Sequence, residues 1–150
     1  MTRPTTPVLL AALLTGLLTA GGALAAQADH VRASQAWIRV LPDALPAAGY
    51  VTLRNDGEQP AILRGASSPA YAQIMLHRSD TSSGMSHMSM LDRLAIPAHG
   101  QVALAPAGYH LMLMDAATPV KAGQTITLTL RFDDGSTLAT DFLAKPANAQ

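Results

Sequence analysis

Short segments in which apolar and polar residues alternate constrain the fold of this chain more than any other feature. Segment 125–132 alternates from end to end, and Asp133-Asp134-Gly135 follows it as a hairpin turn. Gly, Pro, Asn and Asp separate the segments, and none has a sustained helical period. We therefore predict an all-β domain, an antiparallel Greek-key β-sandwich. We expect eight or nine strands, at 36–40, 49–54, 61–66, 72–78, 85–94, 101–104, 109–114, 125–132 and 136–142, with 144–150 as a frayed tail.

The N-terminal segment has the features of a cleaved signal peptide. Arg3 provides a positive charge, 8–20 is a short apolar run, and Ala23-Leu24-Ala25 offers a small-x-small cleavage pattern. We predict a signal peptide over 1–25 and one mature domain over 26–150. An uncleaved anchor is the alternative, but the apolar run is short for a membrane span. We expect an exported, periplasmic protein without stable membrane insertion.

Charge and motif content exclude several functions. Ten Lys and Arg residues balance ten Asp and Glu residues without a run of like charges, so there is no basic stripe for nucleic acid. The sequence has no GxSxG or HExxH pattern and no pair of carboxylates of the kind that hydrolases use. We therefore predict that the protein is not an enzyme. Because the chain has no cysteine, a blue-copper redox site is disfavoured.

Six of the seven methionines lie between Met75 and Met114, interspersed with histidines. A period of two puts His110 and Met112 on one face of their strand, while Met88 lies across the loop 79–84 from His77. Neutral imidazole and thioether donors suit Cu(I), which keeps only a single positive charge in such a set. The pattern predicts one Cu(I) site with the ligands His77, Met88, His110 and Met112.

Other histidines and methionines have simpler interpretations. Met75 and Met114 are predicted to be flexible core residues, because methionine often fills gaps in apolar cores. His99 lies in an evident turn and His30 near the mature N-terminus, so both are predicted to be surface residues.

Three residues next to Met88 form a second group of candidate donors. Met85 and His87 are expected on the opposite face from Met88, whereas Met90 shares the face of Met88. Met90 is therefore the better candidate for an auxiliary donor.

The spacing of the four predicted ligands resembles the signature of the periplasmic copper chaperones of the PCu(A)C type. In that signature, a histidine is followed after ten residues by a methionine and after twenty-one more by His-x-Met, as from His77 through Met88 to His110 and Met112. The similarity extends over the mature chain, with further matching segments at 36–39, 48–50, 65–69 and 106–113.

The resemblance implies a cupredoxin-like sandwich that binds Cu(I) near its surface. It also implies copper delivery to cytochrome oxidase assembly, at the CuA site or a related centre, with a cytochrome oxidase subunit or a thioredoxin-like copper protein as partner. Ser79 and Ser86 stand where family members often have methionine, and 144–150 lacks the His and Met of some family tails. We therefore expect one Cu(I) site and no tail-borne Cu(II) site, in a monomer.

Two alternatives to a chaperone remain. The same site could serve copper storage or resistance, and a metal-free sandwich could serve as an interaction module.

Overall fold

The computed structural model describes residues 25–150. The predicted signal peptide therefore lies outside the described residues, except for Ala25. Within 25–150, no helix combines the length and apolar character needed to cross a membrane.

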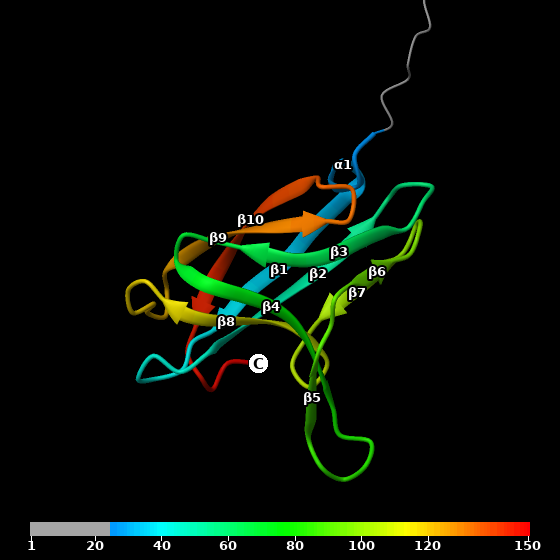
Figure 1. Cartoon of the computed structure of the whole chain (residues 1–150). Coiled ribbons are helices and arrows are strands. Elements are labelled where there is room, and N and C mark those ends of the chain that lie inside the picture. The colour runs from blue at the N-terminus through cyan, green and yellow to red at the C-terminus, as the bar shows by residue number, and fades with distance from the viewer. Residues whose placement is uncertain (1–24) are drawn as a thin grey trace, which may run out of the picture.

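The described chain consists of one helical turn and ten strands (Figure 1). The helical turn is α1 (Gln27–His30), at the start of the domain. The strands are β1 (Val31–Arg39), β2 (Ala47–Asn55), β3 (Ala61–Ser67), β4 (Tyr71–Asp80), β5 (His87–Met90), β6 (Leu94–Ile96), β7 (Gln101–Leu104), β8 (Tyr109–Ala116), β9 (Thr125–Phe132) and β10 (Thr137–Lys145).

The strands form one continuous sheet that folds over itself into a β-sandwich. Its order is β5-β4-β8-β2-β1-β10-β9-β3-β6, and β7 pairs with β2. The all-β sandwich predicted from the alternating segments is confirmed. One pairing differs from the antiparallel prediction, because β1 and β10 run parallel. These are the first and the last strand of the domain, so they are not connected by a hairpin turn.

The interior of the sandwich consists almost entirely of aliphatic side chains from alternate strand positions. On β4 the buried aliphatic positions are Ile74 and Leu76, and on β8 they are Leu111 and Leu113. Residues between them must point to the other face, which is how these two strands carry polar and sulfur-containing side chains without interrupting the core. The fully buried large side chains include Ile38, Leu53, Leu63, Leu76, Ile96, Leu111, Leu113, Leu128, Leu130 and Phe142.

A bulge in β1 lets both halves of this strand contribute to the core. The register with β2 shifts between Ser34 and Trp37, and Gln35 has a positive φ of 53°. The shift changes which residues face inward, so that Val31 before the bulge and Ile38 after it are both buried.

Several predicted boundaries are wrong. The strand expected at 36–40 begins five residues earlier, because β1 is Val31–Arg39. The expected strand 85–94 is two separate strands, β5 and β6, which pair with β4 and β3 respectively. The expected tail begins later than predicted, because β10 continues to Lys145 and Ala144 is buried. Beyond it, Arg39 donates a hydrogen bond from Nη2 to the carbonyl oxygen of Ala149.

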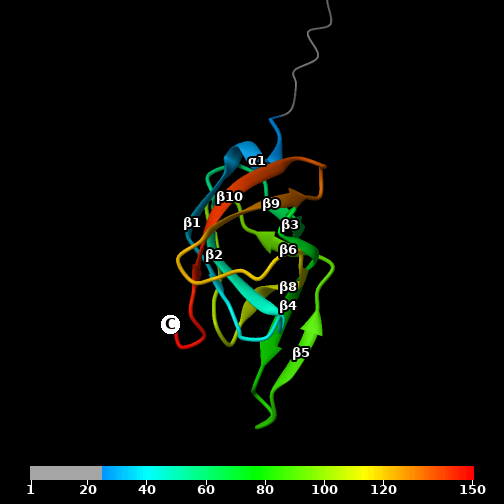
Figure 2. The same ribbon diagram turned by 90° about the vertical axis from the view of Figure 1, so that its left-hand side faces the viewer.

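The hairpin of β4 and β5 projects from one end of the sandwich, as both views show (Figures 1 and 2). Its two strands are paired from His77–Met90 to Asp80–His87, and every residue of β5 is exposed. The hairpin tip closes at Gly84, whose φ of +78° is readily adopted by glycine. The β4–β8 pair at the base of this hairpin carries most of the predicted metal ligands.

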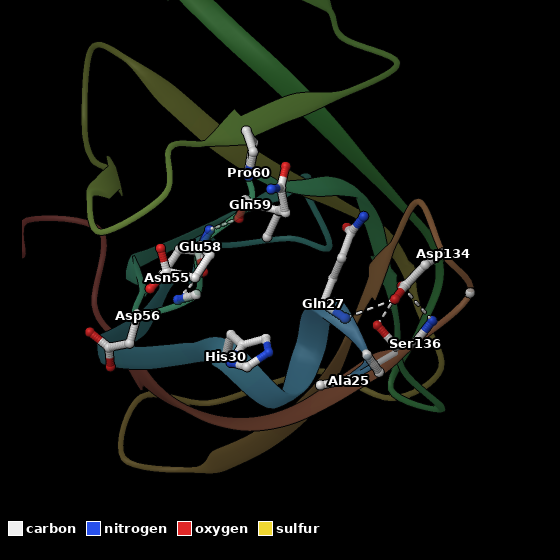
Figure 3. Close-up of a pocket in the computed structure, with 14 residues that line it drawn as sticks. Ala25, Gln27, His30, Asn55, Asp56, Glu58, Gln59, Pro60, Asp134 and Ser136 are labelled. Carbon is white, nitrogen blue, oxygen red and sulfur yellow. Dashed lines mark hydrogen bonds between the residues drawn. The ribbon is translucent and has the colours of Figure 1, made fainter. Parts of the chain in front are cut away.

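The opposite end of the sandwich, beside α1, holds a pocket of about 950 Å³ (Figure 3). Its acidic side chains already have partners. Asp134 accepts hydrogen bonds from the backbone N–H of Gln27 and from Ser136, and Asp56 pairs with Arg32 and with Arg54. These contacts tie α1 and the turns together, and they explain the low pKa values of both carboxyl groups.

Candidate metal centre

Strands β4 and β8 bring two predicted ligands face to face. His77 and His110 are direct partners in the antiparallel register, and their ring centroids are 5.8 Å apart with the planes at 63°. Both lie on the outer face of the pair, because their neighbours Leu76 and Leu111 fill the core. Two imidazoles from residues far apart in sequence therefore converge at one point of the surface.

The imidazole of His77 has no hydrogen-bond partner within the described part of the chain. Both Nδ1 and Nε2 are inaccessible to solvent and unpaired. Burial, and secondarily the nearby His110, lower the pKa of His77 below its ordinary value, so the ring is neutral at pH 7. A neutral ring with an unshared electron pair on one nitrogen fits a metal ligand, whereas an unpaired buried polar group is otherwise costly.

His110 is oriented by the turn that precedes its strand. Its side chain is 5% exposed, and Nδ1 lies 3.1 Å from the carbonyl oxygen of Gly108. A carbonyl can only accept, so this hydrogen bond requires the proton on Nδ1 and leaves the electron pair on Nε2. A hydrogen bond of this kind, on the ring nitrogen away from the metal, fixes the tautomer and orientation of metal-binding histidines.

The methionines occupy the same outer face by register. Met112 follows His110 at two residues and pairs with Met75, so Met112 is diagonal to His77. On the projecting hairpin, Met88 pairs with Ser79. Ser79 lies on the same face of β4 as His77, two residues nearer to the hairpin tip. The structure thus brings His77, His110 and Met112 together at the base, and it positions Met88 diagonally from His77 on the exposed arm.

The prediction that Met75 and Met114 are core residues is wrong. Both are half buried on the outer face, Met75 opposite Met112 and Met114 opposite Gln73. The sequence could have indicated this position, because Met75 and Met114 are an even number of residues from His77 and His110 respectively, and residues so spaced share one face of a strand.

The histidines interpreted as surface residues are exposed. His30 ends α1, and His99 has a positive φ of 52° in a turn, with Nε2 3.1 Å from Oε1 of Glu58. His87 lies on β5 opposite Asp80. None of these three shares the outer-face cluster around His77 and His110.

Over residues 25–150, no group of three or more His, Cys, Asp or Glu side chains is arranged to hold a metal ion. The side chains that share this face with the two imidazoles include the thioethers of Met75 and Met112. Such a mixed set of nitrogen and soft sulfur ligands selects soft ions such as Cu(I) over Mg²⁺ or Ca²⁺.

Fold and donor set together define a class: cupredoxin-like β-sandwiches whose candidate ligands are imidazoles and thioethers. Residues 26–143 match the family model described as "Putative lipoprotein LpqE-like". The chain belongs to this family, which is the PCu(A)C family that the ligand spacing resembles.

Three proteins illustrate the relationship. The chain is 41% identical over 112 residues to "Putative lipoprotein Lxx21020" of Leifsonia xyli subsp. xyli (strain CTCB07), covering 74% of this chain and 67% of that protein. It is 34% identical to Cu(I)-bound DR1885 of Deinococcus radiodurans, with a TM-score of 0.63, over 87% of this chain and 85% of that chain. The apo PmoF2 PCuAC domain is 21% identical over 81% of this chain and 94% of that domain, and its TM-score of 0.67 supports the shared fold.

Proposed function

We propose that this protein is an exported Cu(I) metallochaperone whose ligands are His77, Met88, His110 and Met112. The observation that carries the proposal is the His77 imidazole, whose two ring nitrogens are both buried and unpaired, and which lies directly opposite His110 in the β4–β8 pair. The thioethers of Met88 and Met112 lie on the same outer face. Export rests on the predicted signal peptide over 1–25 and agrees with the lipoprotein names of the family and of its Leifsonia relative.

The donor set suits transport better than catalysis. Two neutral imidazoles and two thioethers leave the ion with one positive charge, and this site requires no redox change for release. Each thioether can be replaced by a similar donor from an acceptor without leaving a charge behind. The Cu(I)-bound structure of DR1885, at 34% identity, supports copper as the cargo.

Anaerobic titration of residues 26–150 with Cu(I) against a competing chelator tests the site. We expect one Cu(I) per chain, and at least about a hundredfold weaker binding for His110→Ala and for Met112→Leu. His99→Ala is the matched control, because His99 is an exposed histidine paired with Glu58. Equal affinities in all four proteins would refute the proposed site.

For the recipient, we propose cytochrome oxidase assembly, at the CuA site or a related copper centre, alone or with a thioredoxin-like copper protein. Loaded protein mixed with an apo CuA domain should transfer its ion, with the absorption of the CuA centre as the readout once a second ion and an oxidant are supplied. Retention of Cu(I) by the loaded protein, together with normal oxidase activity in a deletion strain, would favour storage or resistance instead.

A further inference from the structure

We propose that Met90 is a second, interchangeable thioether for the Cu(I) ion that Met88 binds, so that the hairpin holds the ion by either of two sulfurs. The inference rests on the proposed function and assigns to that site a donor outside its four-residue signature. It concerns only how the ion is held on the hairpin arm.

The strand register favours Met90 over Met88 as the neighbour of His77. Met90 is the direct partner of His77, whereas Met88 is the partner of Ser79. Direct partners on one face of an antiparallel pair have Cβ atoms about 5 Å apart, and diagonal ones about 7 Å. A line of three donors therefore crosses the sheet from Met90 on β5 through His77 on β4 to His110 on β8.

Met88 nevertheless remains within reach of the same ion. It lies two residues from Met90 on the same face of β5, and the thioether is at the end of a flexible chain with three rotatable bonds. Neither side chain is held by the core, since Met88 is 54% and Met90 62% exposed. Two exposed thioethers thus lie next to one imidazole whose ring nitrogens are buried.

Exchange between the two sulfurs is chemically simple. A Cu–S bond to one methionine forms as the Cu–S bond to the other breaks, and the ion stays Cu(I) while both thioethers stay neutral. The exchange would shift the ion between the base of the hairpin, at Met90, and a position further toward its exposed tip, at Met88. An acceptor that approaches the tip would then meet the ion on its outer sulfur, while His77 still binds it.

Four variants of residues 26–150 test this idea: Met88→Leu, Met90→Leu, the double variant, and Met85→Leu. Leucine keeps the volume and apolar character of methionine, so the fold is conserved. Met85 is the matched control, because it is 65% exposed on the same hairpin but precedes the paired strand β5. The readouts are Cu(I) affinity by chelator competition and the number of sulfur neighbours of copper by X-ray absorption.

We expect each single variant to lose no more than about fivefold in affinity and the double variant at least about a hundredfold, because each sulfur replaces the other. The number of sulfur neighbours of copper should fall by one in the double variant and stay unchanged in each single variant. A large loss in one single variant, with no further loss in the double, would overturn the interchange. Failure of the proposed function is a separate result, in which the unmodified protein shows no specific Cu(I) binding or His110→Ala binds Cu(I) as tightly as the unmodified protein.

Discussion

Gly49 on β2 lies directly opposite Leu111 on β8, so closely that a Cβ atom on Gly49 would be 3.3 Å from the Cβ of Leu111. The same atom would be 3.2 Å from Cδ1 of Leu113. The absence of a side chain at Gly49 therefore allows β8 to approach β2, and β8 carries two of the proposed ligands.

We predict that Gly49→Val destabilises the protein by about 1–3 kcal/mol, because its branches would overpack a filled core. Urea unfolding measures the change. Gly108→Ala is the control, since its Cβ would lie at an ordinary 3.5 Å from the carbonyl oxygen of Ala105. Equal unfolding midpoints for both variants would contradict the close approach.

The buried side chain of Asn55 connects β2 to two other segments. It is 1% exposed; Nδ2 donates to the carbonyl oxygens of Gln59 and Ile96, and Oδ1 accepts from the N–H of Gly57. We predict that Asn55→Asp is less stable at pH 7 than Asn55→Ala, which itself loses at least about 2 kcal/mol. The reason is that a carboxylate would face two carbonyl oxygens without a proton to donate.

The Asn55→Asp variant should recover part of this stability in acid, because the protonated form of the introduced carboxyl can donate again. Unfolding measured from pH 7 to 4 tests the trend, with the exposed Asn148→Asp as control. A variant as stable as the unmodified protein at pH 7 would argue against the role of Asn55.

The lowered pKa of His77 makes the stability of the metal-free protein depend on pH. Burial is the main cause of the lowered pKa, and His110 is the second. The contribution of His77 to the free energy of unfolding is therefore fully present at pH values above the unfolded pKa of about 6.5. That contribution is lost as pH falls through the folded pKa, because the unfolded chain takes up the proton more readily. His77→Gln should flatten this part of the stability curve. An NMR titration midpoint of His77 at or above 6.5 would contradict the prediction.

His110 should have a single tautomer before and after metal binding. The contact of Nδ1 with the Gly108 carbonyl requires the proton on Nδ1, so ¹⁵N NMR should show an Nδ1–H ring without metal. Cu(I) should then shift the Nε2 resonance selectively. A metal-free ring protonated mainly on Nε2 would disprove this assignment.

Alternation was enough to predict much of the fold and part of the site. β9 was predicted with its observed bounds, and the shared face of His110 and Met112 follows from a period of two. These features depend on neighbours in sequence, whose side chains the strand geometry orients directly.

Other features depend on long-range pairing, for which no local pattern exists. The parallel contact of β1 with β10 joins segments about a hundred residues apart, and nothing near Ala144 signals that it is buried by this contact. Likewise, the register of the β4–β5 hairpin depends on how its turn closes. The spacing therefore favoured Met88, whereas the register pairs Met90 with His77.

On β4 and β8 the leucines face inward and the imidazoles and thioethers face outward. Release of an ion bound by these outward-facing donors would open no void among the aliphatic side chains, so the core would stay packed in the empty protein. Such a carrier can pass through many rounds of loading and unloading without refolding.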